Sequence, residues 1–577
     1  MKKYFMRIIL SLVLCFCFFQ EKQSQTINLN ERFIQQNLRT AQLLGEFDPS
    51  VSFTSLPIHT GKIGVKIDSS LIGGNEYGAT LKTFFGKHGT LKILPVNFLM
   101  EYSSHHPYNR NNGSMIPNRG YQQLISFGFH AELGPLSIQF KPEGVYAENR
   151  NFEGFPDSHY GSIWSRRYNG LWNYIDMPER FGENAYKKSL FGQSSIRLNY
   201  SGLSLGLSSE NIWWGPSIRN SIMMSNQAQG FNHITFNTTR PLKTFIGNFE
   251  WQVVTGRLEA SGFRPPEPGQ TVGISNFYIP KNDDWRYYQG LTFTYSPKWI
   301  DGLSLGLIRW VQMYGEFATK NRDYFPVFAV LFRDGSGGSA FDYTYDQGID
   351  QAAGIFGRWV WQDAKAEIYG ELNYNDAKYN LRDLMLDSDH ARAYTVGFNK
   401  VFKKNQASKI YKVSYERTMM QQTSSRLLRN AGSWYMHSSV RHGYTNNGEV
   451  IGAGIGPGSN SQYFELSMID KLDKYGVAFE VIDQDNDFFI GAFEEAQDFR
   501  RYWKDFNVHF SFQKKIKNYW GRINVVYSRS LNYQWELEDF TEPYYHAGTD
   551  VNNLHVNFNL TYHFNSKKKH ELNKVYP

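Results

Sequence analysis

The sequence predicts an all-β protein, a transmembrane antiparallel β-barrel of about eighteen strands with a short N-terminal helical or plug segment. Three observations predict this fold. Aromatic residues make up 16% of the chain, although hydrophobic residues in total make up only 41%. Apolar and polar side chains alternate along most of the chain, and in 554–564 the alternation lasts long enough for a tilted membrane strand. Long and short connections also alternate between these segments.

The N-terminus has the features of a secretory signal peptide, expected at residues 1–25. Basic residues precede an apolar run from Ile8 to Phe19, which is too short to cross a bilayer as a helix. Both cysteines, Cys15 and Cys17, lie in this segment, so the mature chain is expected to have no disulfide or thiol site. A lipid anchor on Cys15 is disfavoured, because Leu14 stands where a small residue is expected.

Charge excludes one class of partner. The formal net charge is +7, and removing four basic residues and one acidic residue with the signal peptide leaves +4. A net charge this small does not indicate a nucleic-acid-binding protein. An exported, aromatic-rich barrel is expected in the outer membrane of a Gram-negative bacterium, among outer-membrane lipids and as a monomer.

The chain divides into three further parts. Residues 28–46 have apolar side chains at helical spacing, and Asp48-Pro49 ends the pattern. With the irregular stretch that follows, they are predicted to form a periplasmic or plug segment over 26–89. The barrel is expected over 90–565, and 566–577 is expected to be a periplasmic tail.

Eighteen candidate strands support the barrel. They begin near residues 90, 122, 136, 192, 203, 231, 245, 289, 303, 351, 364, 392, 408, 461, 475, 503, 519 and 553. Nine long connections alternate with eight short ones, such as 134–135 and 201–202. In an outer-membrane barrel this alternation arises because the external loops are long and the periplasmic turns are short, whereas the fold of a soluble sandwich does not require it.

Three connections on the expected outer face are rich in Trp and Tyr, and one of them begins with Trp213 and Trp214. The following Gly-Pro ends any strand there. Sugar rings pack on Trp and Tyr, and Arg or Lys pairs with acidic groups of a polysaccharide. The candidate polysaccharide-binding residues are Trp164, Arg166, Arg167, Trp172, Trp213, Trp214, Trp434, Tyr435, Arg441 and Tyr444. The alternatives are a well-packed loop cap and, for the Trp pair, aromatics at the membrane interface.

No motif predicts catalysis, a cofactor or a metal. The chain has no His-Glu-x-x-His, Gly-x-Ser-x-Gly or Gly-x-x-x-x-Gly-Lys sequence. Weaker signals come from three sets of residues: Asp483, Asp485 and Asp487 with Glu494; Asp176, Glu179 and Asp284; and His437 and His442 beside Arg441. The first set imitates a calcium loop but has Phe488 where the turn requires glycine. The second is compatible with glycosidic cleavage only at a defined carboxyl separation, and the third with an anion or metal site or with plain exposed loops.

Six segments together resemble the Wzi family of outer-membrane capsule-assembly proteins. They are 119–122, 134–139 with 146–148, 176–182, 210–216, 247–262, and 441–446 with 450–452. Glu-Asn-Ile-Trp-Trp-Gly-Pro at 210–216 is the most specific, and the resemblance covers most of the chain from about residue 90. This chain departs from the family in having one clear N-terminal helix pattern where the family has a small bundle.

The resemblance implies an eighteen-stranded barrel plugged by an N-terminal helical element. It also implies a surface lectin that holds exported capsular polysaccharide, without catalysis. An outer-membrane porin or oligosaccharide channel is the first alternative, and a glycan hydrolase is the second.

Overall fold

A computed structural model describes most of the chain. The described residues are 25–63, 77–85, 89–272, 275–318, 348–375, 381–403, 408–427, 429–493, 498–537 and 549–564. The expected tail at 566–577 and, except for Gln25, the expected signal peptide lie outside them. Among the described helices, none has the length and apolar character needed to cross a bilayer.

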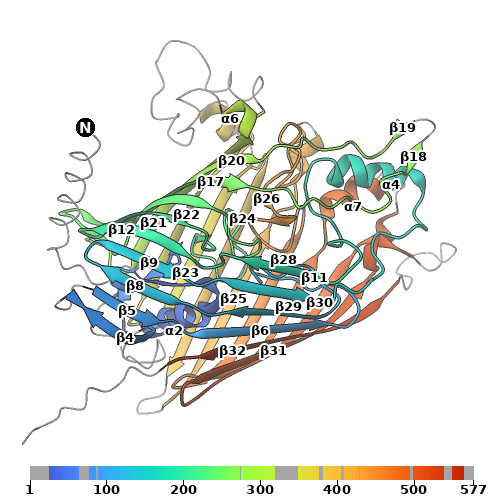
Figure 1. Cartoon of the computed structure of the whole chain (residues 1–577). Coiled ribbons are helices and arrows are strands. Elements are labelled where there is room, and N and C mark those ends of the chain that lie inside the picture. The colour runs from blue at the N-terminus through green and yellow to red at the C-terminus, as the bar shows by residue number, and fades with distance from the viewer. Residues whose placement is uncertain are drawn as a thin grey trace, which may run out of the picture.

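One antiparallel sheet closes on itself, because β32 pairs with β6 along its length (Figure 1). In chain order the wall consists of β5 (Gly89–Ile93) with β6 (Val96–Ser103), β7 (Gly120–Ser126) with β8 (Phe129–Leu133), β9 (Leu136–Phe140) with β10 (Glu143–Ala147), β11 (Tyr186–Leu190) with β12 (Ser195–Tyr200), β13 (Leu203–Ser208), β15 (His233–Thr238), β17 (Gly247–Leu258), β20 (Arg286–Pro297), β21 (Leu303–Tyr314), β22 (Asp350–Trp361), β23 (Ala366–Tyr374), β24 (Arg392–Lys403), β25 (Lys409–Met419), β28 (Asn460–Asp470), β29 (Asp473–Asp483), β30 (Lys504–Ile516), β31 (Tyr519–Leu531) and β32 (Val551–Tyr562). Each predicted strand corresponds to one of these positions, so the predicted antiparallel barrel is confirmed.

The same sheet is divided into 24 strands. Four of the eighteen wall positions are interrupted, so each of them counts as two strands, and two further short strands are added. The added strands are β4 (Ala79–Phe84) and β16 (Leu242–Lys243). The sheet therefore starts with β4, ahead of the boundary expected at residue 90. Sequence reasoning missed β4 because it is short, with a bulge between Thr80 and Lys82.

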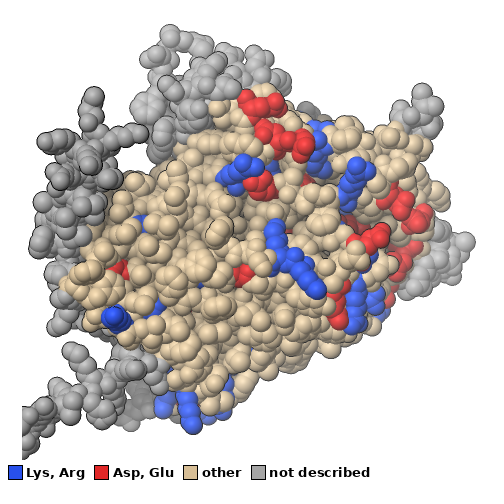
Figure 2. All heavy atoms as spheres, in the orientation of Figure 1, with Lys and Arg blue, Asp and Glu red and all other residues tan. Residues whose placement is uncertain are grey.

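The two faces of the wall differ as the alternation requires. On β12 the side chain of Ile196 is 52% exposed on the outer face, whereas its neighbour Arg197 is 2% exposed and faces inward. Figure 2 shows the consequence, a broad band of the outer surface with few charged side chains, and acidic and basic side chains gathered at the end that carries the long loops. This is the outer surface of a barrel that faces lipid.

The N-terminal segment lies inside the barrel, toward the end opposite α4 and α7 (Figure 1). It consists of β1 (Thr26–Ile27), η1 (Leu29–Glu31), α2 (Arg32–Leu43), β2 (Ser55–Leu56), β3 (Ile58–His59) and α3 (Thr60–Ile63). Phe33 packs against the ring of Trp520 in the wall, with ring centroids 4.7 Å apart. Arg39 forms a buried ion pair with Glu367, the two groups being 3.0 Å apart. The segment is thus fixed to the wall by both apolar and ionic contacts.

The long connections hold the remaining elements. These are β14 (Trp213–Trp214), β18 (Thr271–Val272), β19 (Ser275–Asn276), β26 (Thr445–Asn446), β27 (Glu449–Val450), α4 (Gly161–Arg167), η4 (Tyr168–Trp172), η5 (Gly315–Phe317), α6 (Leu381–Leu386), η8 (Ser424–Leu427), α7 (Asn486–Phe493), η9 (Phe499–Arg501) and η10 (Tyr533–Trp535). Of these, α4, η4 and α7 pack together above one end of the barrel. The alternation of long and short connections therefore sets up an outer cap.

Candidate functional site

The double-tryptophan loop folds into the barrel. β14 pairs with β2 of the N-terminal segment, so Trp213 lies opposite Leu56. The guanidinium of Arg32 lies 3.6 Å from the centroid of the Trp213 ring, and Trp214 Nε1 donates to Gln252 Oε1 at 2.8 Å. Both indole side chains are fully buried. In this conformation they join the loop to the plug and offer no face to a ligand outside the cell.

The long loop between β10 and β11, residues 148–185, places its aromatic residues in a packed cluster. Trp164 and Trp172 have ring centroids 5.8 Å apart and are both buried. Arg167 lies among these rings, 4.8 Å from the centroid of Phe488 on α7, and its guanidinium pairs with Asp485 at 2.8 Å. The cation thus joins α4 to α7. Arg166, the next residue along the chain, is exposed.

The long loop between β25 and β28, residues 420–459, is anchored by its own candidate residues. Trp434, Tyr435 and Tyr444 are buried. Tyr444 stacks on Trp310 of the wall, with ring centroids 4.0 Å apart, and its hydroxyl donates to Met223 O at 2.7 Å. Arg441 donates to three backbone carbonyls, those of Asn173, Ile279 and Pro280.

Of the ten candidate residues, then, the structure brings nine into contacts that build the cap or the plug. Arg166 alone among them lines a large cavity. Whether any of the ten touches a polysaccharide stays a prediction. Their aromatic character was visible in the sequence, but their burial was not.

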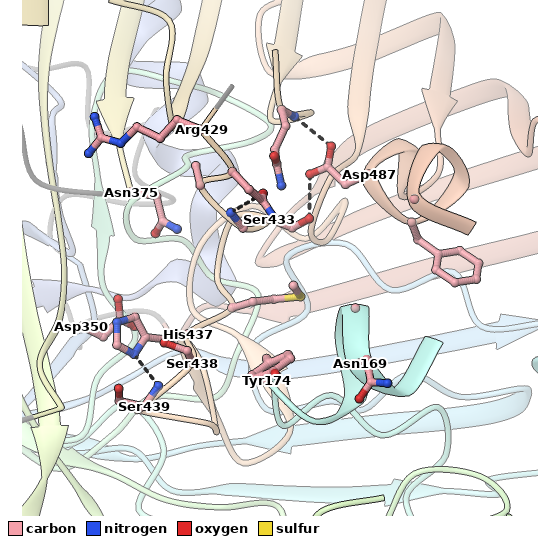
Figure 3. Close-up of a pocket in the computed structure, with 18 of the residues that line it drawn as sticks. Asn169, Tyr174, Asp350, Asn375, Arg429, Ser433, His437, Ser438, Ser439 and Asp487 are labelled. Carbon is pink, nitrogen blue, oxygen red and sulfur yellow. Dashed lines mark hydrogen bonds between the residues drawn. The ribbon is translucent and has the colours of Figure 1, made fainter. Parts of the chain in front are cut away.

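A cavity of about 890 Å³ opens between the long loops. Five of the connections contribute to it, through α4 and η4, the segments around residues 350 and 375, residues 422–439, and α7. Most of the side chains that line it are polar, as Figure 3 shows for Asn169, Asn375, Ser433 and His437. Sequence reasoning missed the amides and serines, since such residues are common in any exposed loop.

His437 has a defined tautomer in this cavity. Its Nδ1 accepts hydrogen bonds from the backbone N–H groups of Ser439 and Val440, at 3.2 and 3.0 Å. Because Nδ1 accepts, the proton of the neutral ring is on Nε2, which is then a hydrogen-bond donor. His442, by contrast, is buried against Tyr314, and burial lowers its pKa to about 3.

Asp487 holds one wall of the cavity. Its carboxylate accepts from the Ser433 hydroxyl at 2.7 Å and from the Gln422 N–H at 2.8 Å (Figure 3). Burial raises the pKa of the Asp487 carboxyl to about 7, although hydrogen bonds from Ser433 and Gln422 favour the ionised form.

This raised pKa predicts a pH-dependent cap. The folded-state pKa of Asp487 lies above the unfolded value of about 3.9. The protonated carboxyl therefore stabilises the folded cap relative to its unfolded form fully at acidic pH, and this stabilisation is lost as the pH rises through about 7. Amide hydrogen exchange in 430–439 and α7 should therefore speed up between pH 6 and pH 8 beyond the intrinsic change. Asp487→Asn should remove that excess. An unchanged excess in the variant would contradict the assignment to Asp487.

The weaker signals from the sequence do not converge. Among the described residues, no group of three or more His, Cys, Asp or Glu side chains is placed to hold a metal ion, and Glu494 lies outside those residues. Asp176 accepts from the hydroxyl of Ser261, Glu179 from the N–H of Phe155, and Asp284 from the N–H of Glu316. Each of these carboxylates thus serves a separate loop contact.

Comparison with known proteins decides the family. The model of the capsule assembly protein Wzi family matches residues 99–519. The chain belongs to this family. As a Wzi family member with a closed barrel, it is an outer-membrane protein of a Gram-negative bacterium, and the resemblance noted in its sequence is confirmed. No curated protein matches it.

Several solved structures are similar to this Wzi family member, and the first of the three described here shares its fold. One is Wzi from Escherichia coli, described as an outer-membrane carbohydrate-binding β-barrel involved in group 1 capsule assembly. It is 11% identical with a TM-score of 0.59, and the match covers 94% of this chain and 100% of that one. OccAB2 from Acinetobacter baumannii is 9% identical with a TM-score of 0.36, over 81% of this chain and 97% of that one. OccK7 from Pseudomonas aeruginosa is 8% identical with a TM-score of 0.36, over 81% and 98%.

Proposed function

We propose that this capsule assembly protein binds capsular polysaccharide in the cavity between its long loops, holds it at the cell surface and does not cleave it. The observation that carries the proposal is the polar cavity of about 890 Å³ above a barrel whose interior contains the N-terminal segment. Family membership and the carbohydrate-binding description of the E. coli relative support the same ligand class.

The chemistry of the lining suits a glycan. The amides of Asn169, Asn375 and Asn430 can each donate to and accept from sugar hydroxyls. Tyr174 supplies an aromatic ring of the kind that packs on the apolar face of a sugar. Arg166 is exposed at the edge of the cavity, where it can pair with an acidic group on the polymer.

The ten candidate residues then have two roles. Arg166 is proposed to contact the polysaccharide. The buried aromatics, with Arg167 and Arg441, are proposed to fix the loops so that the cavity keeps its shape before the glycan arrives. A preformed site loses less conformational freedom on binding, which favours affinity.

A barrel interior that is filled by the N-terminal segment supports the lectin proposal over the porin alternative. The Lys141 ammonium and the Glu31 carboxylate are fully buried and 2.9 Å apart, and Lys62 of the same N-terminal segment pairs with Glu250 of the wall. Separating a charge buried in this way from its partner is costly. These two ion pairs therefore favour an N-terminal segment that stays inside the barrel.

The proposal is tested by incubating the purified protein with the cell's own capsular polysaccharide. We expect the polymer to co-elute with the protein and to keep its chain length over many hours, because the two carboxylates that line the cavity, Asp350 and Asp487, each accept hydrogen bonds from the protein itself. Shortened chains would replace the lectin with a hydrolase. A protein that elutes alone, with intact polymer, would remove the binding function.

A further inference from the structure

The wall of the barrel is interrupted on one side. β13 ends at Ser208 and β15 begins at His233, and the chain between them folds inward. β11 pairs with β10 along one edge. Among the described strands, none is in register with the other edge of β11. β17 continues to Leu258, beyond Gly256, the residue that pairs with His233 at the start of β15. Two wall positions are thus absent between β11 and the end of β17.

A cavity of about 400 Å³ occupies this interruption. Its outward part is formed by Phe140, Pro142 and Phe191, and the side chain of Phe191 is 67% exposed. Behind them lie amide side chains that close the cavity from within, including Gln229 of the loop between β13 and β15 and Asn447 of the loop between β25 and β28. Arg257 and Glu259 also line the cavity, where they form an ion pair with each other. The cavity is therefore apolar at its mouth and polar at its back.

Its height on the barrel is that of the membrane surface. Toward the short turns, the outward side chains of β12 are the exposed apolar residues Ile196 and Leu198. Toward the long loops, the outward side chains of β11 are Lys187 and Ser189, both exposed. Figure 2 shows basic side chains around the position that β11 occupies in Figure 1. The change from apolar to basic residues marks the hydrocarbon–headgroup boundary, where Phe140 and Phe191 lie.

A partly buried cation lies beside the cavity. The ammonium of Lys188 donates to Gln229 Oε1 at 3.2 Å and to Asn447 Oδ1 at 3.0 Å, and both of these residues line the cavity. Neither partner is a carboxylate, and no ion pair of Lys188 occurs within the described part of the chain. The hydrogen bonds of its ammonium thus go to two neutral amide oxygens. An anionic group that entered the cavity would compensate its positive charge.

From this geometry we propose that the side cavity binds the phosphorylated sugar headgroup of an outer-leaflet glycolipid. The acyl chains lie along Phe140 and Phe191, the sugar contacts the amides of Gln229 and Asn447, and the phosphate lies near Lys188. The ligand reaches the cavity sideways from the membrane. This site is separate from the outer cavity proposed for the capsule, and it would fix the barrel to the lipid layer on which the capsule rests.

The test uses the full-length protein in nanodiscs of phosphatidylcholine, with lipopolysaccharide that lacks its O-chain added as the probe. Native mass spectrometry measures the fraction of protein that retains one probe molecule. We expect Lys188→Met to lower that fraction at least fivefold and the matched Lys187→Met to leave it unchanged, because the Lys187 ammonium lies over the ring of Tyr146 rather than beside Gln229 and Asn447. Ser189→Trp, at the mouth, should also lower it and serves if Lys188→Met fails to insert.

Three results would overturn the proposal. Equal retention by both lysine variants would show that Lys188 does not hold the phosphate. Equal retention of phosphatidylglycerol would show that the sugar is not recognised. Pairing of a second copy of the chain along β11, detected as a dimer without glycolipid, would show that a protein strand fills the interruption.

Discussion

Replacing Ser438 with tryptophan is expected to lower the affinity for capsular polysaccharide by at least about tenfold, which corresponds to roughly 1.4 kcal/mol. Ser438 is exposed and lines the outer cavity. An indole at this position would occupy space that the glycan needs, without burying a new polar group in the protein. The affinity is measured with purified polysaccharide and detergent-solubilised protein.

A matched variant separates a blocked cavity from a disturbed surface. Ser162→Trp introduces the same side chain at an exposed position of α4, and Ser162 does not line the cavity. It should bind as the wild type does, and both variants should insert into membranes. Wild-type affinity in Ser438→Trp would exclude this cavity as the binding site.

Replacing Arg358 with methionine is expected to destabilise the closed barrel by about 3–5 kcal/mol, the usual cost of removing one partner from a buried charge network. The Nε of Arg358 donates to Glu367 at 2.7 Å. Its terminal nitrogens donate to Gln42 Oε1 at 2.7 Å and Ser52 O at 3.1 Å, both in the N-terminal segment. After the loss of these bonds, Glu367 keeps its ion pair with Arg39.

Two measurements detect the effect. Urea unfolding should show the lower stability, and planar bilayers should show channel openings that the wild type lacks. Arg309→Met is the control, because Arg309 bonds to Gln351 in the neighbouring strand rather than to the N-terminal segment. If Arg358→Met is as silent and as stable as this control, the network does not hold the plug.

The sequence predicted the barrel well for a physical reason. A strand that faces lipid on one side must alternate, and β32 does so from Leu554 to its last residue, Tyr562. Loop length adds a second, independent signal, because short turns and long loops lie at opposite ends. An interrupted wall position such as β11 with β12 was still predicted as one strand, because the chain continues in the same direction along the wall after the interruption.

The site was predicted less well, because aromatic side chains serve two purposes that share one sequence signature. Trp213 could be a platform for sugar or a packing residue, and only the pairing of β14 with β2 places it inside the barrel. Tyr444 is likewise buried by its stack on Trp310, a residue far away in the sequence. The residues that do line the cavity, such as Asn375 and Ser433, have ordinary loop chemistry.

Hydroxyl-radical footprinting of the wild-type protein, with and without purified capsular polysaccharide, tests the central claim most directly. We predict protection of the side chains that line the outer cavity, above all Tyr174, Met436 and His437, with no change at the short turns. Protection confined to the inside of the barrel, or equal labelling with and without polysaccharide, would contradict the claim that the loops hold the capsule.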